Sequence, residues 1–514
     1  MKARIQHEFL RYASKFSVES MLLVISQIAF DIYTHTDEVF NGFAGYRNYK
    51  VCISGGRIIN DKVLVVQTWL IDLIYELSLI NSQGNKIITR DEALYLIHLY
   101  DNYLNEKDKL RFKAKHHSKI DALLYVCGFF GEQKRFEELH RISEEFSREK
   151  YILEVISMKP EVKSKYGIAF TDEFIVTTGL TTDMYSAILF TIFGYVSQQN
   201  PIIDLNLIKD IFSAFNFSLE DIMSIIERYS CSVDELAKSN LKRQLLYKKP
   251  FIRYNNYIVS ANPFLVASLF VNSNYWIMRD KYSSSKTDSQ KFPNTFGGYF
   301  EEYFKEILNN CLPKDSFKKI DECAEPRADW HIALNDLNFL IEQKSGLSIL
   351  KIKQNESNTE AMKEHILNNW GKAVKQLDNT EKSFGLKDAI KIILVYEDYY
   401  KSECLDLLFE IDPTLKPLDN KKFWLLTINE FEKLLNLFKK DKDLFFEIIK
   451  EKDTLEITSS TDGRDLEMVF GRHNIFRNDY LYDYDIKGQF DKVINLIKNN
   501  EKCGSDDGDT MSTV

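Results

Sequence analysis

The chain is 514 residues long, and its composition is that of a globular protein, with 44% hydrophobic and 13% aromatic residues. This apolar content excludes a disordered chain. The length exceeds the roughly 250 to 300 residues at which single cores stop growing, so we expect two domains. With only 20 Gly and 9 Pro, a protein built from many short strands and tight turns is disfavoured, and helix should dominate.

The formal net charge of −9 differs from the positive footprint that is typical of nucleic-acid-binding proteins. A local basic groove is still compatible with it, because residues 501–514 are predicted to form an acidic, disordered tail. The seven Cys form no CxxC pair, which indicates reduced thiols and not a zinc site. No apolar run approaches the ~20 residues of a membrane-spanning helix, so we expect a cytoplasmic protein that contacts no membrane.

Residues 1–245 are predicted to form a mainly helical domain. Their apolar residues recur at spacings of three and four, the period of amphipathic helices. Ser218 and Ser232, each followed by acidic residues, are typical helix N-caps. Residues 51–54 and 63–67 are compatible with short strands, and this point stays open. We interpret the domain as a recognition or regulatory unit that binds a protein partner, a trigger or the substrate, or forms an oligomer.

Residues 246–290 are predicted to form a small hairpin and a linker. Two aromatic and apolar runs flank Asn255-Asn256, a pair that is typical of a tight turn. The following residues 280–291 are rich in Ser, Lys and Asp, a composition typical of a surface linker. The boundary between the two domains is therefore expected there.

Residues 291–500 show a different order of elements, in which helices and strands alternate. Such alternation predicts a central mixed sheet flanked by helices. The whole chain is therefore predicted to be an α+β two-domain protein. The expected elements are a helix at about 295–309, two short strands within 329–344, a long helix at about 359–378, strands at 389–396 and 423–427, and a helix at 429–439.

The two strands within 329–344 carry the most informative pattern. Asn335-Asp336 occupies the position of a two-residue hairpin turn. Counting outward from that turn, Asp329 faces Glu342 across the strand pair. Directly opposed Cα atoms lie about 4.5 to 5.5 Å apart, and like charges so placed are destabilising. A divalent cation between the two carboxylates would remove that repulsion.

Two further side chains complete the predicted site. Lys344 lies two residues beyond Glu342, so both point to the same face of the strand, whereas Gln343 points away. Paired carboxylates beside an ammonium are what metal-assisted phosphodiester hydrolysis requires. Glu301 lies at the border of the apolar stripe of its helix and is expected to reach the sheet, whereas Glu302 is expected to face solvent.

This ordered set resembles the PD-(D/E)XK nuclease superfamily, which has a restriction-endonuclease-like fold and includes bacterial anti-phage nucleases. The matching order is Phe-Glu on a helix, Asp at a strand start, Glu-x-Lys on the next strand and Lys-x-x-x-Gln-Leu on a helix. The resemblance implies that Asp329, Glu342 and Glu301 bind Mg²⁺ or Mn²⁺. It further implies that Lys344 is the catalytic lysine and that Gln376 approaches the site.

The resemblance covers about a quarter of the chain and departs from the family pattern at one position. The family has Pro immediately before the Asp, whereas here Ala328 stands there and Pro326 lies three residues before Asp329. The function so implied is a divalent-metal-dependent nuclease acting on DNA in preference to RNA, in defence against foreign nucleic acid. The alternatives are a catalytically inactive scaffold that binds nucleic acid or protein, and an effector that stays inactive until a partner binds.

Two basic stretches lie outside the predicted site. Residues 111–119 include His116-His117, and residues 241–249 lie near Tyr247 and Tyr254. Each stretch is compatible with a solvated helix face or with contacts to nucleic acid, where aromatic rings can stack on bases.

Overall fold

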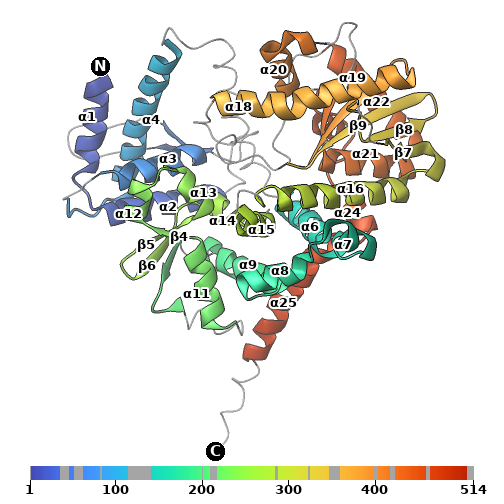
Figure 1. Ribbon diagram of the computed structural model, residues 1–514. Helices are drawn as coiled ribbons and strands as arrows, with labels where there is room; N and C mark the ends of the chain where they lie inside the picture. The colour runs from blue at the N-terminus through green and yellow to red at the C-terminus, as the bar shows by residue number, and fades with distance from the viewer. Residues whose placement is uncertain are drawn as a thin grey trace, which may run out of the picture.

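The computed structural model describes most of the chain and supports a mixed α/β architecture with two mixed sheets (Figure 1). Helices outnumber strands among the described residues, as the low Gly and Pro content predicts. The described residues are 2–34, 46–50, 62–80, 84–113, 141–198, 201–208, 217–271, 273–283, 288–321, 325–346, 359–396, 403–416, 423–458 and 464–505.

The described residues between 2 and 113 form four helices and a two-stranded antiparallel ribbon. Of the two segments left open as strands, residues 62–66 are a strand, whereas residues 51–54 lie outside the described residues. The basic stretch at 114–119, which includes both histidines, also lies outside them. The elements are α1 Lys2–Ala13, α2 Val18–Thr34, β1 Tyr46–Lys50, β2 Lys62–Val66, α3 Gln67–Ser78 and α4 Arg90–Lys113.

A second group of helices follows, and the two predicted N-caps are confirmed within it. The backbone N–H of Asp221 donates to Ser218 Oγ at 3.1 Å, and that of Glu235 donates to Ser232 Oγ at 3.0 Å in a capping box. The helices are α6 Ile142–Lys150, the π-helix η3 Tyr151–Ile156, α7 Pro160–Tyr166, α8 Phe170–Thr178, α9 Thr182–Gln198, α11 Leu219–Arg228 and α12 Val233–Lys238.

The predicted hairpin around Asn255-Asn256 is confirmed, and it forms the centre of a four-stranded sheet in the order β3-β6-β5-β4. The outer strands were not predicted, because three residues are too few to show a period. The predicted linker is shorter than expected, since helices cover both of its ends. The elements are β3 Ile202–Asp204, β4 Ser230–Ser232, α13 Gln244–Lys248, β5 Phe251–Tyr254, β6 Tyr257–Ser260, α14 Pro263–Ala267 and α15 Ser273–Ser283.

The second sheet has five strands in the order β11-β10-β9-β8-β7. β9, β10 and β11 are parallel, whereas β8 and β7 run antiparallel to their neighbours, so the sheet is mixed as predicted. The hairpin between β8 and β9 turns at Asn335, whose φ is +51°. The strands are β7 Phe317–Lys319, β8 Trp330–Leu334, β9 Leu337–Lys344, β10 Ile390–Val395 and β11 Phe423–Thr427.

Helices cover both faces of this sheet (Figure 1), because the strand side chains that point to either face are mostly apolar. One face, which includes Ile341, packs against α16, α21 and α22. The other face, which includes Leu340, packs against α18 to α20. The helices are α16 Lys291–Cys311, α18 Thr359–Ile366, the π-helix η5 Leu367–Gly371, α19 Lys372–Phe384, α20 Glu403–Ile411, α21 Ile428–Lys440 and α22 Lys442–Thr458, with 3₁₀ turns η4 Lys314–Ser316 and η6 Pro413–Leu415.

The largest apolar core crosses the domain boundary expected near residue 290. It joins helices α6 to α9 with α16 and with the C-terminal helices, as in the contact of the Phe146 and Phe490 rings at 6.0 Å. A buried ion pair, in which Arg148 Nε donates to Glu432 Oε1 at 2.7 Å, adds to this junction. A separate core holds the apolar residues of α1 to α4 and part of the four-stranded sheet, Cys231 and Ile252, whereas Ile203, Phe251 and Ile258 of that sheet belong to the larger core. Residues 142–198 therefore pack with the α/β region rather than with the first helices.

The C-terminal segment is helical for longer than the sequence predicted. It contains α23 Leu466–Arg472, α24 Asp479–Asp483 and α25 Gly488–Ser505. The first five residues of the predicted disordered tail thus belong to α25, and residues 506–514 lie outside the described residues. Within the described ranges no single helix is long and apolar enough to cross a membrane, although the bent pair α8 and α9 passes on length and composition together.

Candidate active site

The predicted register of the β8–β9 hairpin places an acidic pair at its open end. Pairing runs from Leu334–Leu337 to Trp330–Ile341, as expected from a two-residue turn. One residue further out, the Asp329 N–H donates to the Ile341 carbonyl at 3.0 Å. The Asp329 carboxylate accepts from the Gln343 N–H at 2.7 Å. Asp329 is therefore fixed beside the end of β9 that carries Glu342.

Side chains alternate along this end of β9 as predicted. Lys344 Nζ donates to Glu342 Oε1 at 2.7 Å, so the two side chains share one face. Gln343 points to the opposite face, where its Oε1 accepts from Trp330 Nε1 at 2.7 Å. Glu342 and Lys344 follow Leu340 and therefore lie on the side of the sheet that α19 covers.

The two carboxylates repel each other in a buried setting. Glu342 is only 3% exposed. Burial and then the charge of Asp329 raise the pKa of Glu342 to about 7, against the opposing effects of Lys344 and Gln376. Burial also raises the pKa of Asp329, and the charge of Glu301 adds to the increase, whereas the Gln343 N–H and Lys344 oppose it. A positive charge between Asp329 and Glu342 would relieve this repulsion.

The residues present fit a divalent cation at the Asp329–Glu342 pair. Glu342 Oε2 is buried and has no hydrogen-bond partner among the described residues. An unsatisfied buried carboxylate oxygen is destabilising, and oxygen is the ligand that Mg²⁺ and Mn²⁺ prefer. The chemistry of the donors and the orphaned oxygen therefore both favour a cation.

Glu301 does not join this pair as a third ligand in the arrangement observed. Its carboxylate forms an ion pair with Lys319 and lies 3.8 Å from Lys165 Nζ. Within the part of the chain that the structure describes, no group of three or more His, Cys, Asp or Glu residues is arranged to hold a metal. Glu301 acts on Asp329 through its charge only, and the candidate metal site consists of two carboxylates.

The contrast expected between Glu301 and its neighbour Glu302 is wrong. The side chain of Glu302 is 19% exposed, and that of Glu301 is 24% exposed. Burial therefore does not distinguish them, because Lys165 of α7 lies close to both carboxylates, at 4.0 Å from Glu302. The distinguishing feature is the effect of Glu301 on the pKa of Asp329.

Gln376 lies at the edge of the site, as the resemblance implies. Its Nε2 donates to the Arg327 carbonyl at 3.1 Å, which ties α19 to the segment before β8. Its amide also lowers the pKa of Glu342. Lys372, one turn earlier on α19, is exposed.

Sequence reasoning missed Lys319 of β7 and Lys165 of α7. Lys165 comes from the part of the chain that was predicted to be a separate domain. It reaches Glu301 because Gly298 lets α16 approach α7: a Cβ at that position would overlap the ring of Tyr166. Only the tertiary packing brings these lysines to Glu301, so no local pattern could have indicated them.

No family model, curated protein or solved structure matches this chain. The function is therefore argued from the geometry and chemistry of the Asp329, Glu342 and Lys344 side chains.

Proposed function

We propose that the protein is a divalent-metal-dependent nuclease that hydrolyses phosphodiester bonds of DNA in preference to RNA. The observation that carries the proposal is the buried pair Asp329 and Glu342, with an orphaned carboxylate oxygen and with Lys344 at 2.7 Å from Glu342. A role in defence against foreign nucleic acid follows from the resemblance alone.

The three side chains have separate tasks in this proposal. Asp329 and Glu342 hold Mg²⁺ or Mn²⁺. When bound, such an ion polarises a phosphate oxygen and acidifies water. Lys344, whose side chain is 22% exposed, reaches solvent and orients the attacking water or stabilises charge that develops on the phosphate. Gln376 positions the segment before β8 and favours the ionised form of Glu342.

A cleavage panel tests the proposal. The full-length protein is incubated with labelled single- and double-stranded DNA and RNA, in Mg²⁺, in Mn²⁺ and in EDTA. We expect cleavage that needs the metal and that is lost in Glu342→Gln and in Lys344→Met. Lys238→Gln, which removes an exposed and distant lysine, is the matched control. Circular dichroism checks the fold of each variant, and undiminished cleavage in both site variants would overturn the proposal.

A catalytically inactive scaffold with the same sheet is the second candidate. It is favoured by the ion pair that holds Glu301 against Lys319 and by Ala328 at the position of the family Pro. Titration with Mn²⁺ distinguishes the two candidates. A scaffold has no Mn²⁺ site, or one that Asp329→Ala leaves unchanged. Mn²⁺ binding that Asp329→Ala abolishes, without cleavage of any substrate, would instead indicate an effector that needs a partner, bound through the N-terminal helices.

A further inference from the structure

Two cations next to the candidate site have no acidic partner in the part of the chain that the structure describes. Lys318 of β7 and Arg327, two residues before Asp329, make no ion pair within the described residues. Arg327 Nε is buried and also lacks a hydrogen-bond acceptor there. Both cations lie over the ring of Phe384, with Lys318 Nζ at 4.9 Å and Arg327 Cζ at 5.8 Å from its centroid. Cation–π contacts of this kind position a cation but leave its hydrogen-bond donors free.

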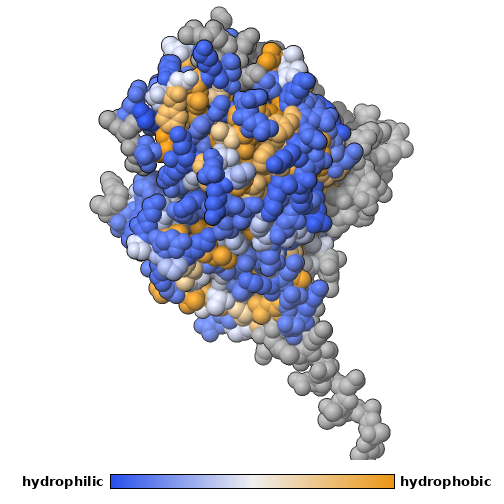
Figure 2. Space-filling view, turned by 90° about the vertical axis from the view of Figure 1, so that its right-hand side faces the viewer, coloured by the Kyte–Doolittle hydropathy of each residue, from blue (hydrophilic) through white to orange (hydrophobic). Residues whose placement is uncertain are grey.

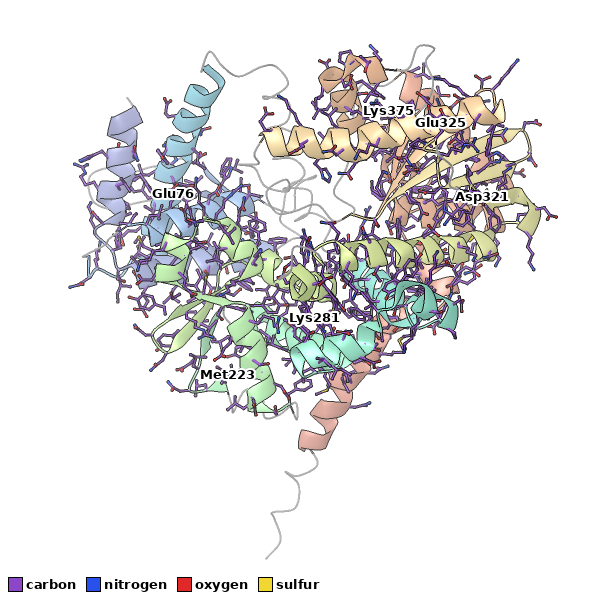
Figure 3. All side chains as sticks on the ribbon, viewed as in Figure 1. Glu76, Met223, Lys281, Asp321, Glu325 and Lys375 are labelled. Carbon is purple, nitrogen blue, oxygen red and sulfur yellow. The ribbon has the colours of Figure 1, made fainter. Side chains whose placement is uncertain are left out.

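The segment before β8 is fixed against α19, which determines where Arg327 lies. Gln376 Nε2 donates to the Arg327 carbonyl at 3.1 Å, and the Ala328 N–H donates to Thr380 Oγ1 at 2.7 Å. Phe384 follows Thr380 by one turn of the same helix. Figure 3 labels Glu325, which lies in this segment, and Lys375 of α19, and the two residues lie close together in that view.

Lys318 lies on the same face of the sheet as the catalytic pair. It is the register partner of His331, which in turn pairs with Leu340. Since laterally paired residues share a face and alternate residues of a strand do so too, Lys318 and Glu342 are both on the side of α19. Lys318 and the acidic pair therefore lie on the same side of the sheet, where Lys318 is exposed and Glu342 is buried.

The exposed charged residues of α19, the helix that carries Phe384, are all lysines, whereas Asp321 and Glu325 are exposed acids close to Lys318 and Arg327 in the chain. The acidic residues of α19, Asp378 and Glu381, are bound to the buried Lys391 of β10. The exposed side of α19 presents lysines instead, at positions 372, 375 and 382. Figure 2 looks onto the side of the molecule where β7 and β8 lie and shows hydrophilic residues with hydrophobic patches between them in its upper half.

We propose that Lys318 and Arg327 form a subsite for a backbone phosphate of the polynucleotide strand that is cut at Asp329 and Glu342. This subsite rests on the proposed function, because it would bind the nucleic-acid substrate of that activity. A guanidinium binds phosphate through a planar fork of donors, and that of Arg327 forms no ion pair with a carboxylate of the described residues. Arg327 precedes Asp329 by two residues, a distance of roughly 7 Å in an extended chain. The subsite would therefore bind a phosphate next to the one at which the strand is cut.

Binding without cleavage tests this subsite. The full-length protein is titrated in EDTA against fluorescein-labelled single-stranded and duplex oligonucleotides, and anisotropy gives the Kd at several salt concentrations. Each lost phosphate contact lowers the slope of log K against log salt by about 0.7 for single strands and about 0.9 for duplex DNA. We expect this decrease in Lys318→Gln and in Arg327→Gln. Arg327→Lys, which keeps the charge, retains most of the slope.

The control is Lys238→Gln, which makes the same charge change at a remote exposed site and is expected to keep the wild-type slope. Thermal denaturation of each variant establishes that the fold is intact. Wild-type slopes in both Lys318→Gln and Arg327→Gln would overturn the subsite and leave the nuclease proposal standing. Equal competition by polyglutamate would overturn it too, because the surface would then bind acidic protein. A wild-type protein that neither binds nor cuts any of the oligonucleotides overturns both proposals.

Discussion

The two sheets of this protein contain hairpins of the same local design. β5–β6 turns at Asn255-Asn256 and β8–β9 turns at Asn335-Asp336, and in each the first turn residue has a left-handed φ, +50° at Asn255 and +51° at Asn335. Each hairpin also lies in a mixed sheet, with one parallel neighbour, β4 for β5 and β10 for β9.

The hairpins differ at their open ends. The β5–β6 pair ends at Phe251 and Ser260, both buried, where the neighbouring backbone of Ala261 donates to the Pro250 carbonyl. The β8–β9 pair ends at Asp329 and Glu342, where buried charge is left unbalanced. The same turn and register thus support a structural hairpin in one sheet and a candidate active site in the other. The difference lies in what the fold buries at the open end.

The largest effect on cleavage should come from removing the charge of Glu342 or of Lys344 at the open end of the β8–β9 hairpin. Glu342→Gln and Lys344→Met should each lower the single-turnover cleavage rate at least about 100-fold, the loss typical of a preorganised charged group in an active site. Arg253→Gln, on β5 of the other hairpin, removes an exposed cation 3.8 Å from Glu227 and should change nothing. A rate loss of equal size in Arg253→Gln would remove the distinction between the hairpins.

The turns should behave alike in stability and differently in activity. Asn335→Ala and Asn255→Ala should each lower the free energy of unfolding by about 1 kcal/mol, because Ala tolerates the left-handed conformation poorly. Gly at either position should restore stability. Cleavage should fall in Asn335→Ala alone, since only that turn sets the register of Asp329 against Glu342. Urea denaturation and cleavage assays on the four variants measure both effects.

The pH dependence of stability follows from the raised pKa of Glu342. Its value in the folded protein, about 7, exceeds the model value of 4.5. The folded state therefore holds more protons between these values, and this carboxyl lowers stability as pH rises through that window, by about 1.4 kcal/mol per unit of difference. Metal-free Glu342→Gln should melt above the wild type at about pH 8, and the gap should close toward pH 4.5.

Added Mn²⁺ provides the control for that experiment. It should raise the melting temperature of the wild type but not that of Glu342→Gln, because ligand binding stabilises only the protein that holds the site. A gap between the two proteins that is the same at every pH would contradict the raised pKa.

A smaller effect is expected from Gln376→Leu. The amide lowers the pKa of Glu342, so its loss should shift the rising limb of the pH profile of cleavage upward. The rate near neutral pH should fall and should recover at higher pH. Asn379→Leu is the matched control, because Asn379 Nδ2 donates to the Pro326 carbonyl at 3.5 Å and anchors the same segment without touching Glu342. An identical shift in both variants would assign Gln376 a structural role only.

The β8–β9 hairpin could be predicted from the sequence because its determinants are local. The Asn335-Asp336 turn and the alternation of Glu342, Gln343 and Lys344 fix register and face together. Strands β8 to β11 and helices α16, α18, α19 and α21 were predicted to within about six residues, whereas the three-residue strand β7 and helices α20 and α22 were not predicted.

Other features depend on tertiary packing and could not be predicted from the sequence. An amphipathic period shows that α6 to α9 bury a face, but not that the face packs against α16. Nor does it show that Lys165 meets Glu301 and Glu302. The same limit explains why Glu302 was wrongly expected to face solvent, since Lys165 comes from a helix about 135 residues away in the chain.

Calorimetric titration of the full-length protein with Mn²⁺ tests the central claim most directly. We predict a single-site isotherm for the wild type and for Arg253→Gln, and no binding in Asp329→Asn or in Glu342→Gln. The affinity should weaken as the pH falls through about 7, because Glu342 must lose its proton to bind the ion. A wild-type protein that binds no Mn²⁺, or an Asp329→Asn variant that binds it unchanged, would contradict the account.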